Sequence, residues 1–153
     1  MKIRPFKNSD QEALLELFCT TIKEVNSKDY SEKQISLWGS KERLEKNWSD
    51  SFKNKNVWVA ENDKELLGFC ELTAEGYIDR FYCSSSAVGK GVGKQLYEEL
   101  EKHARIKSIS RLTVAASITA KDFFRKLGFN VVREQTVFIQ DTPFINFYME
   151  KDL

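Results

Sequence analysis

Cysteine and histidine are scarce in this chain, and their placement excludes several kinds of site. The three cysteines, Cys19, Cys70 and Cys83, lie far apart within apolar patterns. This spacing predicts neither a disulfide framework nor a paired metal site. The only histidine, His103, lies in a charged segment with helical spacing. We therefore expect no catalytic Cys–His pair and no metal, and we interpret the cysteines as buried structural residues.

The chain also lacks an excess of one charge and a long apolar run. Its 24 basic and 23 acidic residues leave a net charge of +1, so no overall field steers it toward nucleic acid or a membrane. No apolar run approaches the roughly 20 residues of a membrane span, and the start, Met1 to Phe6, does not have the pattern of a signal peptide. We expect a cytoplasmic protein with a single domain over residues 1–153.

Apolar spacing predicts strands and helices along the whole chain. A capping box from Ser9 to Glu12 and a second from Ser31 to Gln34 precede helical patterns. Further helices are predicted over 92–104 and 119–127. Strands are predicted at 3–6, 57–61, 66–73, 77–83, 111–116, 129–139 and 144–149, with a last turn at 141–143. The order β-αα-βββ-α-β-α-ββ indicates an α/β chain of the α+β type, a mixed sheet with helices on its faces.

Three of the seven glycines stand in one short stretch, Gly89-Lys90-Gly91-Val92-Gly93, between a predicted strand and a predicted helix. Without Cβ atoms, the backbone can approach an anion closely and turn successive N–H groups toward it. The helix start adds free donors and partial positive charge. The spacing matches neither G-x-x-x-x-G-K-S/T nor G-x-G-x-x-G. We interpret the stretch as a cradle for phosphate groups; the alternative is a flexible loop without a ligand.

The order of elements and two separated motifs resemble the GNAT superfamily of acyl-CoA-dependent N-acetyltransferases. The first motif, a strand followed by a glycine-rich loop and a helix, falls on Cys83, Ser85, Val88, Gly91 and Gly93. The second falls on Ser117, Ala120, Phe123-Phe124 and Lys126-Leu127-Gly128-Phe129. Within the superfamily, Tyr77-Ile78-Asp79-Arg80 and the ending Asn146 to Lys151 are similar to a bacterial subgroup whose substrates are unassigned.

This resemblance implies acetyl-CoA as co-substrate and a fold whose central strands, 77–83 and 111–116, splay apart. The pantetheine arm would fill the gap and the glycine loop would hold the pyrophosphate. By resemblance, the cofactor-binding residues are Phe81, Tyr82, Cys83, Val88, Gly89, Lys90, Gly91, Val92, Gly93, Lys94, Ser117, Ala120, Phe123, Phe124 and Lys126.

One departure from the family bears on catalysis. Phe124 stands where many members have a tyrosine, the proposed proton donor to the leaving thiolate. A thiol with a pKa of roughly 8 to 9 can leave without that acid. Asp79 is our candidate base, acting through water, because strand alternation would place it on the side of Phe81 and Cys83. It could instead hold Arg80 or a substrate ammonium.

Three further side chains are candidates for proton transfer, and four for binding the acceptor. Glu71 is the second candidate base, and Tyr82 or Tyr148 could donate a proton to sulfur. The candidate acceptor-binding residues are Asn26, Asp29, Tyr30 and Trp38.

The sequence leaves the acceptor and the assembly open. A pocket with one carboxylate and aromatic walls favours a small primary amine, such as an amino acid. A protein N-terminus or lysine is the first alternative, and a non-catalytic acyl-CoA-binding module, which Phe124 favours, is the second. The oligomeric state, a homodimer included, is not fixed by the sequence.

Overall fold

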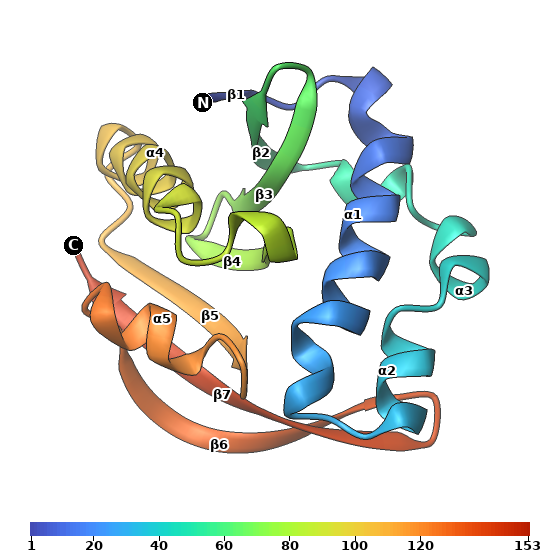
Figure 1. The fold of residues 1–153 in the computed structure, drawn as a ribbon. Coiled ribbons are helices and arrows are strands. Elements are labelled where there is room, and N and C mark those ends of the chain that lie inside the picture. The colour runs from blue at the N-terminus through green and yellow to red at the C-terminus, as the bar shows by residue number, and fades with distance from the viewer.

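A seven-stranded mixed sheet forms the centre of the computed structural model, which describes all residues from 1 to 153. The strand order is β1-β2-β3-β4-β5-β7-β6, and only β4 and β5 are parallel (Figure 1). The strands are β1 (Lys2–Pro5), β2 (Lys55–Asn62), β3 (Glu65–Thr73), β4 (Tyr77–Cys83), β5 (Arg111–Ser117), β6 (Asn130–Ile139) and β7 (Thr142–Asp152). The predicted mixed sheet and element order are thereby confirmed.

Helices cover both faces of the sheet. They are α1 (Gln11–Glu24), α2 (Glu32–Trp38), α3 (Lys41–Glu45), α4 (Val92–Ile106) and α5 (Lys121–Lys126). Figure 1 shows α4 and α5 on one side and α1, α2 and α3 on the other. None of them combines enough length and apolar character for a membrane crossing.

Each face of the sheet has its own hydrophobic core. On the α4 side, Leu96 and Leu100 are fully buried together with Ile78 of β4. On the α1 side, Leu14 and Ile22 are fully buried together with side chains of β2 and β3. β4 belongs to both cores, so its two sides are fixed independently by packing.

The start of α2 follows the sequence prediction. The Ser31 hydroxyl accepts the Gln34 N–H at 3.2 Å, and the Gln34 side chain accepts the Ser31 N–H at 2.8 Å. This reciprocal pair satisfies two donors that a helix start leaves free. The capping box from Ser31 to Gln34 is confirmed.

The capping box predicted for α1 is wrong. The helix begins at Gln11, and the carboxylate of Asp10 accepts the Lys7 N–H at 2.8 Å. The same carboxylate also binds the guanidinium of Arg4 at 2.9 Å. An acidic side chain tied to both the preceding turn and β1 replaces the predicted Ser9 cap, because it offers two acceptor oxygens where serine offers one hydroxyl.

The last hairpin turns one position earlier than predicted. Ile139 pairs directly with Thr142, so the loop is Gln140 and Asp141, and Pro143 already lies in β7 opposite Phe138. Gln140 has a φ of 51°, as a tight hairpin of this length requires.

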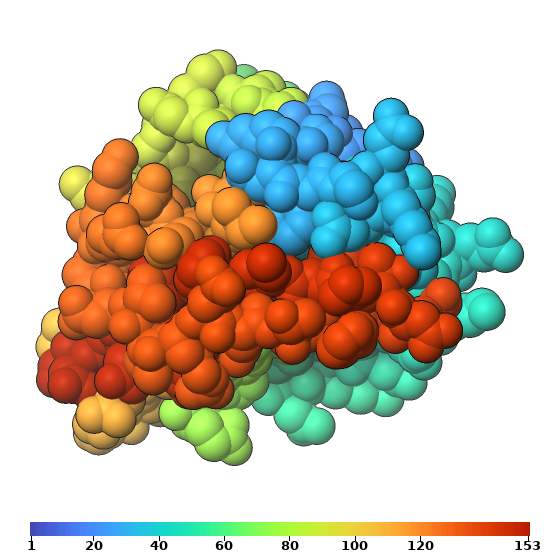
Figure 2. Space-filling model, turned by 90° about the horizontal axis from the view of Figure 1, so that it is seen from below, coloured from blue at the N-terminus to red at the C-terminus, as the bar shows by residue number.

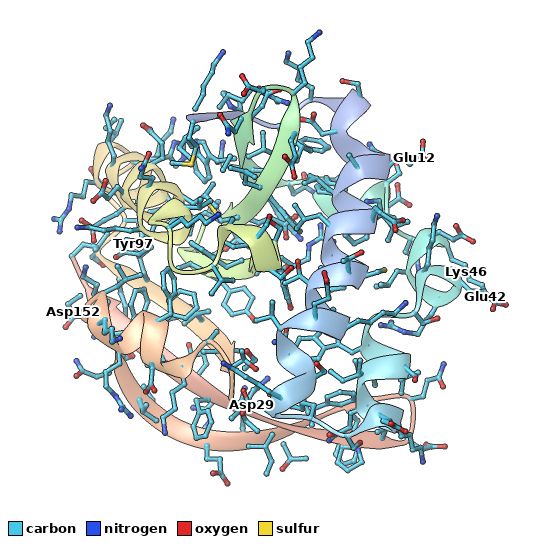
Figure 3. All side chains as sticks on the ribbon, viewed as in Figure 1. Glu12, Asp29, Glu42, Lys46, Tyr97 and Asp152 are labelled. Carbon is cyan, nitrogen blue, oxygen red and sulfur yellow. The ribbon has the colours of Figure 1, made fainter.

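A half-buried ionic cluster joins α4 to the end of β7 and to the turn after α5. The ammonium of Lys151 donates to Glu101 and to the Leu127 carbonyl, each at 2.7 Å, and Tyr97 donates to Glu101 at 2.6 Å. Figure 3 shows Tyr97 on the side of α4 that faces α5. Burial opposes the charge of Glu101, but the hydrogen bonds from Lys151 and Tyr97 outweigh it and lower its pKa to about 2.

Candidate active site

The two central strands separate after two paired positions. β4 pairs with β5 only at Tyr77 opposite Thr113 and Ile78 opposite Val114. Beyond Ile78, β4 continues to pair with β3, and β5 continues to pair with β7. A wedge therefore opens between Asp79–Cys83 and the end of β5, and the main-chain groups on its two sides have no partner across it.

A single cavity of about 570 Å³ occupies this wedge and extends past it. One end reaches Val88, Gly89 and Gly93 in the loop between β4 and α4. The other end lies between the β6–β7 hairpin and the α1–α2 segment, where Asn26, Tyr30, Trp38, Val137, Ile139, Phe144, Ile145 and Asn146 line it. The predicted cofactor loop and the predicted acceptor region thus share one space.

The glycine loop and the start of α4 offer free main-chain donors, and two of the residues that carry them, Gly89 and Gly93, line the cavity. The N–H groups of Val88 and Lys90 donate to Ser84 and Ala87, each at 3.2 Å. The N–H groups of residue 89 and of residues 91–94 have no acceptor within the chain. Five free donors in a loop that leads into a fifteen-residue helix are what a pyrophosphate group requires. The loop residues therefore fit the pyrophosphate of a CoA molecule.

The three glycines of the loop have two different reasons to be glycine. Gly89 and Gly91 have φ values of 79° and 81°, and a Cβ on either would meet no atom within 4 Å. Their backbone conformation is the reason, and the space above them is open. A Cβ on Gly93 would lie 2.9 Å from the Phe123 ring, so this glycine permits close packing of α4 against α5.

The second predicted motif forms the floor of the wedge on the α5 side. The Ser117 hydroxyl accepts the Ala120 N–H at 3.0 Å, so this serine shapes the turn into α5. The rings of Phe123 and Phe124 lie 5.3 and 5.6 Å from that of Phe81 and border the cavity with it. The lysines of the prediction, Lys90, Lys94 and Lys126, are exposed and do not line the cavity.

Asp79 lies on the cavity wall, but not on the side that alternation predicts. The pairing of β3 with β4 passes from Leu72 opposite Ile78 to Cys70 opposite Phe81, so β4 contains one extra residue. Ile78 and Phe81, three positions apart, consequently pack into the same α4-side core. The predicted common side for Asp79, Phe81 and Cys83 is wrong, because this β-bulge resets the alternation.

The bulge turns Asp79 toward a lysine of β2. The Lys55 ammonium lies 2.6 Å from Asp79 Oδ2 and 3.3 Å from Glu71 Oε1. The Asp79 side chain remains 39% exposed and contributes to the cavity lining. This carboxylate is therefore both accessible to a ligand and held in place by a cation.

Glu71 is not positioned to act as the base. Its side chain is fully buried, does not line the cavity, and binds the Arg80 guanidinium through both oxygens, with 2.6 Å from Arg80 Nε to Glu71 Oε1. Arg80 in turn stacks over the rings of Trp48 and Phe52, 4.4 and 4.7 Å from their centroids. The geometry gives Glu71 the role of holding Arg80 and Lys55 and gives no support to a role in proton transfer.

The two candidate tyrosines differ in their access to the cavity. Tyr82 lines it, with its ring 4.6 Å from Phe18, and burial raises the pKa of its hydroxyl. Tyr148 does not line it, and the Arg133 guanidinium lies 4.5 Å above its ring. Only Tyr82 is therefore positioned to meet a ligand in the cavity.

The α1–α2 segment closes over the cavity and is bonded to its far side. The Tyr30 hydroxyl donates to the Ile145 carbonyl at 2.7 Å and accepts the Ile118 N–H at 2.9 Å. Asp29 accepts a hydrogen bond from the Thr119 hydroxyl at 2.8 Å. In Figure 2 this segment, in blue, meets the orange residues that follow β5, and Figure 3 places Asp29 at the foot of α1.

These contacts give the four predicted acceptor-binding residues different roles. Asn26, Tyr30 and Trp38 line the cavity, but Asp29 does not. The Tyr30 hydroxyl and Asp29 Oδ2 hold the roof across the splay, so both residues have a structural role that the prediction did not include. Asn26 is buried and Trp38 packs edge-on against Tyr30, with ring centroids 5.2 Å apart.

Sequence reasoning missed several polar residues of the cavity wall, three of which lie on α1 and on the last hairpin. Thr21 of α1, Gln135 of β6 and Asn146 of β7 all line it. Thr21 Oγ1 and Asn146 Oδ1 are buried and have no hydrogen-bond partner. A polar side chain on the inward face of a predicted strand was the signal available for Asn146 and Gln135.

Comparison with known proteins agrees with this architecture. A family model described as an acetyltransferase (GNAT) domain matches residues 26–151. The uncharacterized N-acetyltransferase YafP of Escherichia coli (strain K12) is 36% identical over 149 residues, with 97% of this chain and 94% of YafP covered.

Two crystal structures extend the comparison to three dimensions. A GCN5-related N-acetyltransferase from Rhodopseudomonas palustris, described as a class-II aminotransferase, superposes with a TM-score of 0.94 at 30% identity over 99% of this chain and 95% of that one. The PaiA N-acetyltransferase of Thermoplasma acidophilum, in complex with coenzyme A, gives a TM-score of 0.76 at 27% identity over 99% and 98%. The chain belongs to the GNAT acetyltransferase family and is an acetyl-CoA-dependent N-acetyltransferase.

Proposed function

We propose that this enzyme acetylates the primary amine of a small molecule, such as an amino acid, by direct transfer from acetyl-CoA. This proposal rests mainly on the cavity of about 570 Å³, which runs from the glycine loop to a space roofed by Tyr30 and Trp38. Sites for small molecules typically occupy about 300–1,000 Å³, and this cavity must hold the pantetheine arm as well as the acceptor, so the space left for the acceptor is small. A roof hydrogen-bonded across the splay restricts entry of a folded polypeptide, which an open groove would admit.

Main-chain groups would carry most of the cofactor binding. Acetyl-CoA, when bound, supplies an acyl group activated as a thioester. The free N–H groups of residues 89 and 91–94 would hold the pyrophosphate, with Lys90 and Lys94 adding positive charge at the rim. The unpaired edge of β4 at Phe81 and Cys83 would hold the pantetheine arm in the wedge. Main-chain donors aimed at a reacting carbonyl contribute about 2.7–4 kcal/mol in other enzymes.

The thiol in the cavity supports direct transfer without an acyl-enzyme. Cys83 lines the cavity, and burial raises the pKa of its thiol to about 12. At neutral pH the reactive thiolate is then a negligible fraction of this residue. The amine of the acceptor is the better nucleophile in this cavity.

Asp79 would accept the proton that the acceptor ammonium must lose. Lys55 binds Asp79 Oδ2, which leaves Oδ1 available to a water or to the ammonium itself. An amine with a pKa near 10 needs about 4 kcal/mol to lose its proton at pH 7, and a positioned carboxylate supplies the acceptor for it.

The leaving sulfur has no strong acid beside it. Phe124 has no proton to donate, and the raised pKa of Tyr82 means that it holds its proton more firmly than a CoA thiol with a pKa near 8.5 would. Tyr82 can donate a hydrogen bond to the sulfur, while water supplies the proton.

Release of CoA thiol with a panel of small primary amines tests this function. We expect turnover with small amines and a loss of roughly 100-fold for Asp79→Asn at pH 7. At pH 9 the fraction of free amine is about 100 times larger, so this loss should shrink below roughly tenfold. The exposed Asp122→Asn variant of α5 is the matched control and should behave as wild type.

Two results would contradict the proposal. Turnover confined to peptides with a free N-terminus or a lysine would show a protein acceptor. A loss in Asp79→Asn that stays the same from pH 7 to 9 would show that Asp79 positions the acceptor and does not move its proton.

A further inference from the structure

Three uncharged polar side chains form a row across the cavity wall, on three adjacent strands. Gln135 of β6 pairs directly with Asn146 of β7, and Asn146 pairs directly with Ser117 of β5 on its other side. Residues opposite each other in antiparallel strands point to the same face, with Cβ atoms roughly 4.5–5.5 Å apart. All three line the cavity, so the two carboxamides lie side by side on its wall.

Asn146 lacks the hydrogen bonds that a side chain in this position needs. Its Oδ1 is buried and has no donor, whereas the neighbouring Ser117 hydroxyl is already occupied by the Ala120 N–H at 3.0 Å. The next pair along the same two strands, Val137 opposite Phe144, is apolar and also lines the cavity. Most buried polar side-chain atoms in proteins have a hydrogen-bond partner, so this carboxamide is a candidate for contact with a ligand in the cavity.

The charged residues around the cavity limit which chemical groups of a ligand can bind at this row. Asp79 and Lys28 are the only charged residues of its lining, and Lys28 is exposed on the turn after α1. No cation therefore lies in the carboxamide row itself. A carboxamide offers both donors and acceptors, so it matches a group that also has both, such as a hydroxyl or another carboxamide.

We propose that Gln135 and Asn146 form a recognition subsite for an uncharged hydrogen-bonding group of the acceptor. The acceptor is then a small primary amine that also carries a hydroxyl or a carboxamide; this inference rests on the proposed function. A carboxylate in the same place would meet no cation in the row to balance its charge, and an apolar group would leave both carboxamides unpaired.

Four amines of nearly equal size separate these alternatives: L-alaninamide, L-alaninol, L-alanine and 3-methylbutan-2-amine. Each amine is compared between wild type and Asn146→Leu, so that differences in amine pKa cancel. We expect kcat/KM to fall about 10- to 100-fold for the amide and the alcohol, and less than about threefold for 3-methylbutan-2-amine. Gln135→Leu should show the same selectivity, and Gln95→Leu on the exposed face of α4 should show none.

If Asn146 had only a structural role, its substitution would lower kcat/KM for all four amines equally, and that result overturns the inference. Wild-type preference for L-alanine over L-alaninamide, corrected for free amine, also overturns it. The inference is also overturned if none of the four amines is acetylated while other amines of the wider panel are. Failure of every amine, with acetyl-CoA binding intact by calorimetry, contradicts the proposed function itself.

Discussion

Removal of one hydroxyl group tests whether Tyr30 holds the roof of the cavity. In Tyr30→Phe the ring remains packed against Trp38 and Phe144, 5.2 and 6.0 Å away. The Ile145 carbonyl loses a donor at 2.7 Å and the Ile118 N–H loses an acceptor at 2.9 Å. The substitution therefore removes two hydrogen bonds and little apolar contact.

The expected cost follows from those two bonds. Leaving a buried main-chain group without a partner costs about 1–3 kcal/mol, and partial access of water reduces this. Since both bonds are only partly buried, we expect Tyr30→Phe to lower the free energy of unfolding by about 1–3 kcal/mol in total. With a urea m-value of about 2 kcal/mol/M, the midpoint of unfolding should fall by about 0.5–1.5 M.

Urea denaturation followed by tryptophan fluorescence measures this midpoint. Tyr148→Phe is the matched control, because it also removes one phenolic hydroxyl, from a tyrosine of β7 whose ring stays beneath Arg133. An unchanged midpoint for Tyr30→Phe, together with a raised KM for the acceptor, would refute the reasoning. The hydroxyl would then contact substrate and would not close the roof.

Two further predictions concern the cofactor loop and the ionic cluster on α4. Gly91→Val should weaken acetyl-CoA binding at least tenfold by calorimetry. A β-branched residue avoids a φ of 81°, so the loop would change conformation and its free amides would no longer face the phosphates. Gly128→Val, at a φ of 101° outside the cavity, is the control and should bind acetyl-CoA normally. The pKa of Glu101 is lowered from 4.5 to about 2, so its charge stabilises the fold above pH 4.5 and this contribution is lost as pH falls toward 2. The difference in unfolding free energy between wild type and Glu101→Gln should therefore shrink across that range, and a constant difference would contradict it.

Patterns local to the chain predicted most of the fold. The bounds of β4, Tyr77–Cys83, and the capping box at Ser31 depend on residues within a few positions of each other, and both agree with the structure. The splay between β4 and β5 came from the family resemblance, since no spacing within either strand encodes it.

Long-range geometry explains the errors at the site. Alternation placed Asp79 beside Phe81, but the extra residue in β4 becomes visible only when its pairing with β3 is known. Asp29 and Tyr30 have the residue types of a binding site, yet their partners lie about 90 positions away or more, at Thr119 and Ile145. Sequence spacing alone gives no measure of such a contact.

The extra residue of β4 also makes room for a second charged side chain between the apolar ones. It lets the α4 side of the strand remain apolar at Ile78 and Phe81 while Asp79 and Arg80, of opposite charge, stand next to each other toward the α1 side. Deleting either one would leave a single residue opposite Glu71, so Ile78 and Phe81 could keep their pairing with Leu72 and Cys70, but the strand would lose one of its two charges. The bulge thus lets one short strand supply both a carboxylate to the cavity wall and a guanidinium to the buried Glu71 while its pairing with β3 continues on either side.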